Sequence, residues 1–226
     1  MLTEHTKIKQ LDVASKKSSS NNDLLLVEKP FHITLNQTTS THHAIPQFIE
    51  FLIQGLHYCQ NQSLSKLKLD GSEAGRLVAE EIPDQDHQLS AHPITELSIQ
   101  PPMLIDWGRQ FRDSQTLYRQ TGATQSTGIL LTNGEVFSIE CIDFHSSFLK
   151  LMGALIKKAH AFYPIFFSSH RMSLNDLFFM DVLAPNIIIC QSAITSPAVA
   201  KLIESKCTVY GFCRKNKFNR YSNFHL

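Results

Sequence analysis

The residues best suited to chemistry in this sequence are basic side chains near its C-terminus. Arg214, Lys215, Lys217 and Arg220 lie close together, although the formal net charge of the 226-residue chain is only +1. Arginine matches the oxygens of a phosphate with two parallel hydrogen bonds. We therefore expect a local anion site here. For Lys215, Lys217 and Arg220 the open alternative is a solvated basic segment that binds nothing specific.

Two further polar clusters follow apolar runs. The pattern S-x-R-x-S at 169–173 follows PIFF, and Ser192, Thr195 and Ser196 follow NIIIC. If these runs and TVYGF are parallel strands, their carboxyl ends share one sheet edge, where ligands bind in open α/β folds. Pro197 predicts a helix capped by Ser196, whose free N–H groups would favour a phosphate. A plain capped helix is the alternative.

The elements that must position these residues are predicted from hydrophobic periodicity. In the C-terminal half, helical and strand patterns alternate, which favours βαβ units and a parallel sheet with helices on its faces. Residues 45–59 and 107–122 have helical patterns, and the second ends at Gly122. Residues 126–141 predict a hairpin with a type I′ turn at Asn133-Gly134.

The N-terminal part is polar or strand-like. Residues 1–22 lack apolar periodicity, which is typical of a flexible tail. Residues 24–35 indicate short strands around Pro30, a residue that favours a sheet edge, and residues 71–102 indicate loops and weak strands. We predict a tail at 1–22, a β-rich part with one helix at 23–105, and an α/β cofactor-binding domain at 106–226.

Composition bounds the class of protein. Five cysteines do not suggest a disulfide scaffold, and neither an apolar secretion signal nor a membrane-spanning run is present in the sequence. A net charge near zero offers no broad basic face for nucleic acid. We therefore expect a cytoplasmic protein that binds neither nucleic acid nor membranes. No histidine or cysteine spacing predicts a metal site.

Together these residues resemble a known family. Three motifs occur in order: Ser169-x-Arg171-x-Ser173, Ser192-Ala193-x-Thr195-Ser196, and Gly211-Phe212-x-Arg214 followed by Asn219-x-Tyr221. With Glu28-Lys29-Pro30, Thr121-Gly122, Glu140, His145 and Lys150, they resemble FdhD, the formate dehydrogenase accessory sulfurtransferase family. The resemblance implies a homodimer with a cytidine-deaminase-like domain, in which helices flank a central sheet, and a smaller β-rich N-terminal part.

The resemblance also implies a ligand, partners and a pocket. Family members take sulfur from a cysteine desulfurase and pass it to the bis-guanylyl molybdenum cofactor for formate dehydrogenase. The residues expected to bind this cofactor are Thr121, Gly122, His145, Ser169, Arg171, Ser173, Ser192, Thr195, Ser196, Arg214, Asn219 and Tyr221. His145 is open to a second interpretation, as a structural histidine.

The sequence departs from the family at its cysteines. The family's sulfur transfer uses a CxxC, and this chain contains none, which makes it a divergent member. Cys213, beside Arg214, is the best-placed substitute, because nearby cations favour a thiolate; a buried, inert thiol is the alternative. Two functions therefore stay open, a sulfur-transferring accessory protein and a non-catalytic cofactor- or nucleotide-binding paralogue. A third function, a zinc deaminase on the same type of fold, is disfavoured, because its H-x-E and P-C-x-x-C motifs are absent.

Overall fold

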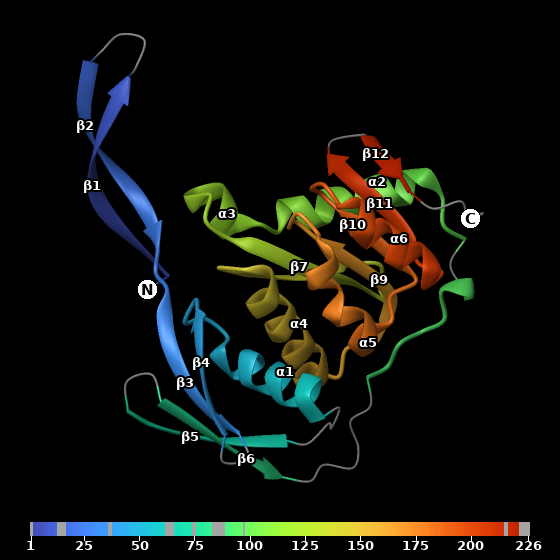
Figure 1. Cartoon of the computed structure of the whole chain (residues 1–226), viewed down its shortest axis with the longest axis horizontal. Helices are drawn as coiled ribbons and strands as arrows, with labels where there is room; N and C mark the ends of the chain where they lie inside the picture. Colours follow the sequence, from blue (N-terminus) through green and yellow to red (C-terminus); the bar gives the residue numbers. More distant parts are fainter. Residues whose placement is uncertain are drawn as a thin grey trace.

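The protein has a mixed α/β fold built around a central six-stranded sheet (Figure 1). The computed structural model describes residues 2–12, 17–35, 38–61, 66–73, 76–82, 89–96, 98–214 and 217–221. The central sheet has the order β12-β11-β10-β9-β7-β8. Its strands are β7 (Gln125–Leu131), β8 (Val136–Cys141), β9 (Phe162–Ser168), β10 (Ile187–Cys190), β11 (Thr208–Arg214) and β12 (Lys217–Arg220).

The middle of this sheet is parallel. Strand β10 pairs in parallel with both β9 and β11, as the alternating sequence pattern predicted. Strand β7 runs antiparallel to β9 and β8, and β12 runs antiparallel to β11, so the whole sheet is mixed. The three parallel strands therefore end at one common edge.

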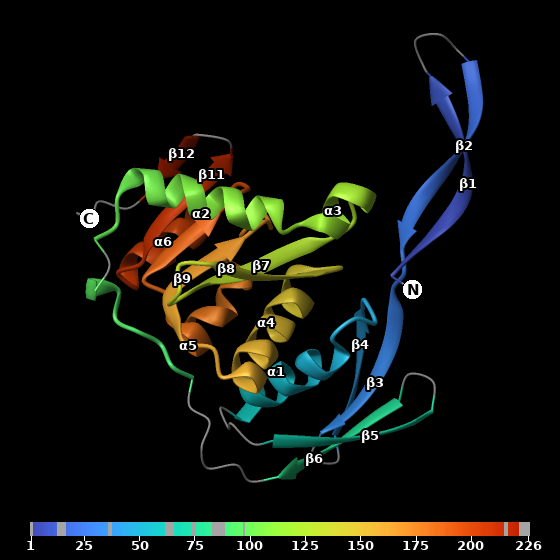
Figure 2. The ribbon, with the colours of Figure 1, turned by 180° about the vertical axis from the view of Figure 1, so that it is seen from behind.

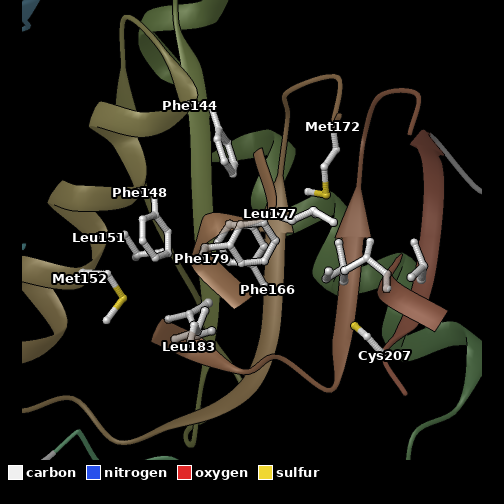
Figure 3. Close-up of a cluster of buried hydrophobic side chains, with 14 of the residues drawn as sticks. Phe144, Phe148, Leu151, Met152, Phe166, Met172, Leu177, Phe179, Leu183 and Cys207 are labelled. Atoms are coloured by element: carbon white, nitrogen blue, oxygen red, sulfur yellow. The ribbon is translucent and has the colours of Figure 1, made fainter. Parts of the chain in front are cut away.

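Helices cover both faces of the sheet. One face packs under α2 (Pro101–Asp113), which contributes Leu104, Trp107 and Phe111 to a buried cluster with the alternate residues Ile187 and Ile189 of β10. The other face is covered by α4 (Phe144–Lys158), the 3-10 helix η2 (Leu174–Phe179), α5 (Met180–Leu183) and α6 (Ser196–Glu204). Figure 3 shows the aromatic centre of that second cluster, where side chains from α4, β9 and η2 meet.

A second layer lies against α4. Helix α1 (Ile49–Asn61) crosses α4 at Gly55 and Gly153, where an added Cβ would stand 1.8 Å and 1.9 Å from backbone oxygens of the opposite helix. A four-stranded sheet of order β4-β3-β6-β5 lies beyond α1 (Figure 2). Its strands are β3 (Lys29–Leu35), β4 (Thr38–Ala44), β5 (Lys66–Glu73) and β6 (Arg76–Ile82).

The N-terminal segment is not the predicted tail. Strands β1 (Thr3–Asp12) and β2 (Lys17–Leu26) pair antiparallel along ten register positions and extend away from the body of the protein (Figures 1 and 2). A two-stranded ribbon pairs its inward backbone groups and leaves the outward ones to water, so it needs no apolar face, and hydrophobic periodicity did not predict it.

Other local predictions differ from the structure in detail. The helical pattern at 107–122 is divided between α2, which begins earlier at Pro101, and the short α3 (Thr116–Thr121). Pro30 was expected at a sheet edge, but it lies near the start of β3, which is an inner strand. The pairing of β3 with β6 begins only at His32, so the missing N–H of Pro30 breaks no hydrogen bond to β6. A short 3-10 helix, η1 (Ile94–Glu96), precedes α2.

The predicted hairpin is present, with a different turn. Strands β7 and β8 pair from Gln125 and Cys141 to Leu130 and Val136, as expected. A type I′ turn needs positive φ at both central residues, and here only Gly134 has one, at 86°. The N–H of Gly134 donates to the carbonyl of Leu131, so the glycine serves the end of the turn rather than its centre.

Candidate anion-binding cleft

A cleft of about 890 Å³ lies at the carboxyl edge of β9, β10 and β11, where sheet topology predicted a site. Its residues come from the ends of these strands on one side and from α2, α3 and the start of β7 on the other. They are Arg112, Asp113, Gln115, Tyr118, Arg119, Gly122, Ala123, Thr124, Gln125, Ile142, Ser169, His170, Arg171, Gln191, Ser192, Cys213 and Arg214.

The sheet-edge wall contains the residues on which the sequence analysis concentrated. Ser169, Arg171, Ser192 and Arg214 all line the cleft. The Nε of Arg214 donates a 2.9 Å hydrogen bond to the carbonyl of Gln191, which fixes the guanidinium while leaving its terminal nitrogens available to an anion. Arg171 is exposed, and we find no partner for its guanidinium in the part of the chain that the structure describes.

A bulge in β11 directs Cys213 and Arg214 towards this wall. The pairing with β12 shifts register between Gly211 and Arg214, and Phe212 between them has a φ of 52° and is 41% exposed. A bulky residue in the left-handed region costs about 1–3 kcal/mol, and bulges change the direction of the side chains that follow. The sequence motif gave no signal for this backbone strain.

The opposite wall was missed by sequence analysis. Arg112 and Arg119, from α2 and α3, line it with Tyr118, whose side chain is 49% exposed. Nη1 of Arg119 donates to the carbonyl of Asp113 at 2.9 Å, so this guanidinium also closes the C-terminal end of α2. Periodicity assigned these residues to a helix, but it did not predict that the helix end faces the sheet edge.

Glu140 holds the start of α3 in place. Its carboxylate accepts hydrogen bonds from the N–H groups of Leu117 and Tyr118, at 2.9 and 2.8 Å, and from the hydroxyl of Thr124 at 2.9 Å. A carboxylate is favourable at a helix N-terminus, where backbone N–H groups lack partners. Glu140 therefore positions the helical wall rather than lining the cleft.

Several predicted residues lie outside the cleft lining. Thr121 donates its hydroxyl to the carbonyl of Leu117, within α3. Tyr221 packs over Gly211, where an added Cβ would meet its ring at 2.7 Å, and Asn219 is exposed on β12 opposite Gly211. The structure brings the predicted residues Gly122, Ser169, Arg171, Ser192, Cys213 and Arg214 together in the cleft, and places Thr121, His145, Ser173, Thr195, Ser196, Asn219 and Tyr221 elsewhere.

The start of α6 also differs from the prediction. Thr195, not Ser196, is the N-cap, and no side-chain hydrogen bond closes the cap. The N–H of Thr195 instead donates to the carbonyl of Met172 at 2.9 Å, which links this loop to the one after β9. Both residues are exposed and outside the cleft, so the first turn of α6 does not form its wall.

His145 lies in the first turn of α4. Its ring packs on Phe178 at 4.8 Å, and burial lowers its pKa while nearby Asp143 acts in the opposite direction. Burial also lowers the pKa of His42 on β4, and the nearby charge of His145 lowers it further. These contacts support the interpretation of His145 as a structural histidine between two parts of the fold.

The cysteines of the cleft region are not activated. Burial raises the pKa of the Cys213 thiol to about 12, and nearby Cys190 adds to this effect. The pKa of Cys190 is also raised by burial to about 12, and its S–H donates to the carbonyl of His170. A transferable persulfide requires a thiolate, and therefore a cysteine of lowered pKa. Arg214 was expected to lower the pKa of Cys213, but burial raises it.

A family model establishes the relationship of the chain. The FdhD/NarQ family matches residues 52–225, which include every residue of the cleft. The protein belongs to the FdhD/NarQ family. A crystal structure of a candidate formate dehydrogenase accessory protein from Desulfotalea psychrophila is similar in fold, with a TM-score of 0.79, 15% sequence identity and 98% of each chain covered. Among curated proteins, no sequence matches the chain.

Lys150, one of the residues that carry the resemblance to the FdhD family, has a structural role in this chain. Its side chain is only 1% exposed, and its Nζ donates 2.7 Å hydrogen bonds to the carbonyls of Ile45 and Gln47. Lys150 thus fastens the segment between β4 and α1 to α4, and burial lowers its pKa.

No helix in the described ranges is long and apolar enough to cross a membrane.

Proposed function

We propose that this protein binds a nucleotide pyrophosphate in the arginine-lined cleft, as a non-catalytic accessory protein of formate dehydrogenase maturation. The ligand suggested by the family is the bis-guanylyl molybdenum cofactor. The observation that carries the proposal is the convergence of Arg112, Arg119, Arg171 and Arg214 on one cleft, from two walls. Guanidinium groups bind phosphate oxygens through charge-assisted hydrogen bonds, each contributing about 1.5–3 kcal/mol.

The cleft is suited to such a ligand in size and chemistry. About 890 Å³ lies within the range of small-molecule and cofactor sites, which is roughly 300–1,000 Å³. The buried Nε2 of Gln191 lacks a hydrogen-bond partner among the described residues, and a polar atom in that condition favours a neighbouring acceptor. When bound, the cofactor would supply the metal chemistry, and the chain would supply phosphate binding and orientation.

The thiol chemistry favours a binding role over sulfur transfer. The sequence lacks a CxxC, and Cys213 is half-buried with a raised pKa. We therefore propose that a cysteine desulfurase does not load the protein efficiently. The proposals that formate dehydrogenase is the partner and that the protein acts as a homodimer rest instead on its membership of the FdhD/NarQ family.

Binding is tested by calorimetric titration of the purified protein with GDP at two salt concentrations. We expect saturable binding that weakens as salt is raised, because the contacts are ionic. Inosine diphosphate and ADP, titrated in parallel, would separate recognition of the base from recognition of the pyrophosphate. Absence of binding by all three nucleotides would contradict the proposal.

Sulfur transfer is the second candidate, because Cys213 lines the cleft. Incubation with a cysteine desulfurase and cysteine, followed by mass spectrometry, should show little persulfide on any cysteine. A full persulfide adduct of about 32 Da that maps to Cys213 and is lost in Cys213→Ser would instead favour transfer.

A further inference from the structure

His170 is a cleft residue that neither the motifs nor the proposed function uses. It lies between Ser169 and Arg171, and all three line the cleft. In the motif S-x-R this position is the variable residue. The surroundings of the ring indicate a more specific role.

The ring and backbone of His170 are held from several sides. Its imidazole stacks on Phe144 of α4, with centroids 5.3 Å apart and planes 24° from parallel. Figure 3 shows Phe144 at the end of the aromatic cluster, beside Phe148 and Phe166, so the surface under the imidazole is part of the core. The N–H of His170 donates to the hydroxyl of Ser168 at 3.1 Å, which fixes the backbone.

One ring nitrogen faces an oriented carboxylate. Nε2 of His170 lies 3.4 Å from Oδ2 of Asp176, and the two side chains are only 25% and 21% exposed. The same Oδ2 accepts hydrogen bonds from both the N–H and the hydroxyl of Ser173, each at 2.6 Å. Ser173 therefore fixes Asp176, and Asp176 in turn fixes the imidazole.

This arrangement leaves the other nitrogen for a ligand. Within the described ranges, Nδ1 of His170 makes no hydrogen bond, and the nearest cation in sequence is Arg171. With the Asp176 carboxylate at Nε2 and a phosphate oxygen at Nδ1, both nitrogens of the ring would act as donors. Such a ring presents a second donor beside a guanidinium, which is a suitable pair for two oxygens of one phosphate.

We propose that His170 contacts a phosphate of the ligand through Nδ1, and that Ser173 and Asp176 are positioning residues that hold it there. This inference rests on the proposed function, since it assigns a contact within the same cleft. It also gives a role to Ser173, which matches the family motif but does not line the cleft.

The test compares GDP and inorganic pyrophosphate binding in the wild type and four variants, by calorimetry. His170→Ala should weaken both ligands about tenfold, the effect of losing one charge-assisted hydrogen bond. Asp176→Asn should weaken them in the same direction. His170→Asn, whose side-chain amide can donate from the place of Nδ1, should bind more tightly than His170→Ala.

Asp176 also caps η2, so a control for folding is needed. Adding Asp176→Asn to His170→Asn should cost little further affinity, because the amide donates without a carboxylate behind it. Equal losses from Asp176→Asn in both backgrounds would mean that it acts through the fold of η2, and would overturn the positioning role. If the wild type binds and His170→Ala binds equally well, the contact itself is wrong; if the wild type does not bind, the proposed function fails first.

Discussion

The side-chain amide of Gln115 donates a 2.9 Å hydrogen bond to the side-chain oxygen of Gln191, and this bond joins the two walls of the cleft. Gln115 is 4% exposed at the junction of α2 and α3, and its amide also donates to the carbonyl of Phe111. Gln191 follows β10, the central parallel strand. The spacing between the arginines of opposite walls therefore depends on this buried pair.

Gln115→Leu should both destabilise the protein and weaken GDP binding. A buried acceptor left without its donor costs about 1–3 kcal/mol, and the walls lose their direct link. Denaturant unfolding would measure the first effect and calorimetry the second. Gln120→Leu is the matched control, because Gln120 is exposed on α3 and should change neither quantity appreciably. Normal GDP binding by Gln115→Leu would contradict the role of the link.

Arg214→Ala should weaken GDP binding by about tenfold to a hundredfold. Losing a charge-assisted bond of about 1.5–3 kcal/mol has that effect, because each 1.4 kcal/mol is a factor of ten. Lys217→Ala removes a neighbouring positive charge that is exposed on β12 and does not line the cleft. It should lose little affinity, and mostly at low salt. Similar losses of affinity in both variants would show that the basic C-terminal residues act only by general electrostatic attraction and that Arg214 makes no specific contact.

Gly153→Ala should destabilise the protein by about 3 kcal/mol or more, because overpacking against backbone cannot relax by a rotamer change. The added Cβ would stand 1.9 Å from the carbonyl oxygen of Phe51, so α1 and α4 would have to separate. Gly108→Ala is the control, since a Cβ there meets nothing within 4 Å. It should stabilise α2 by about 1 kcal/mol through helix propensity, and urea unfolding would measure both.

The sequence predicted the part of the site that one rule of topology governs. Because β9, β10 and β11 are parallel, Ser169, Ser192 and Arg214 reach one edge, as expected. The opposite wall depends on how the end of α2 packs over that edge, which periodicity does not encode. Thus Arg112 and Arg119 were missed although their helix was predicted.

Family motifs were informative about positions but not about roles. Glu140 and Lys150 hold backbone groups of α3 and of the segment before α1, and Ser173 holds Asp176. None of the three lines the cleft, and each acts by holding other groups in place, so the motif alone could not separate ligand contact from positioning. Lys215, the remaining member of the basic run, lies outside the described residues.

The last prediction concerns acid stability. Burial lowers the pKa of both His42 and His145, and each pKa in the folded protein is therefore below the ordinary value of about 6.5. Between the lowered and the ordinary pKa, the unfolded chain binds more protons than the folded one, so stability falls as pH drops through and below 6.5. The N-terminus of α4, with its positive dipole end, disfavours a protonated His145 further.

The double variant His42→Gln/His145→Gln should therefore lose less thermal stability than the wild type when pH is lowered from 7.5 to 5.5. His42 lies on β4 and His145 in the first turn of α4, so acid should loosen the contact between β4 and the start of α4. Melting temperatures across this range, each referred to the same protein at pH 7.5, remove any constant effect of the substitutions. An identical pH dependence in both proteins would show that other groups carry the acid sensitivity and that this pair does not couple the two parts of the fold.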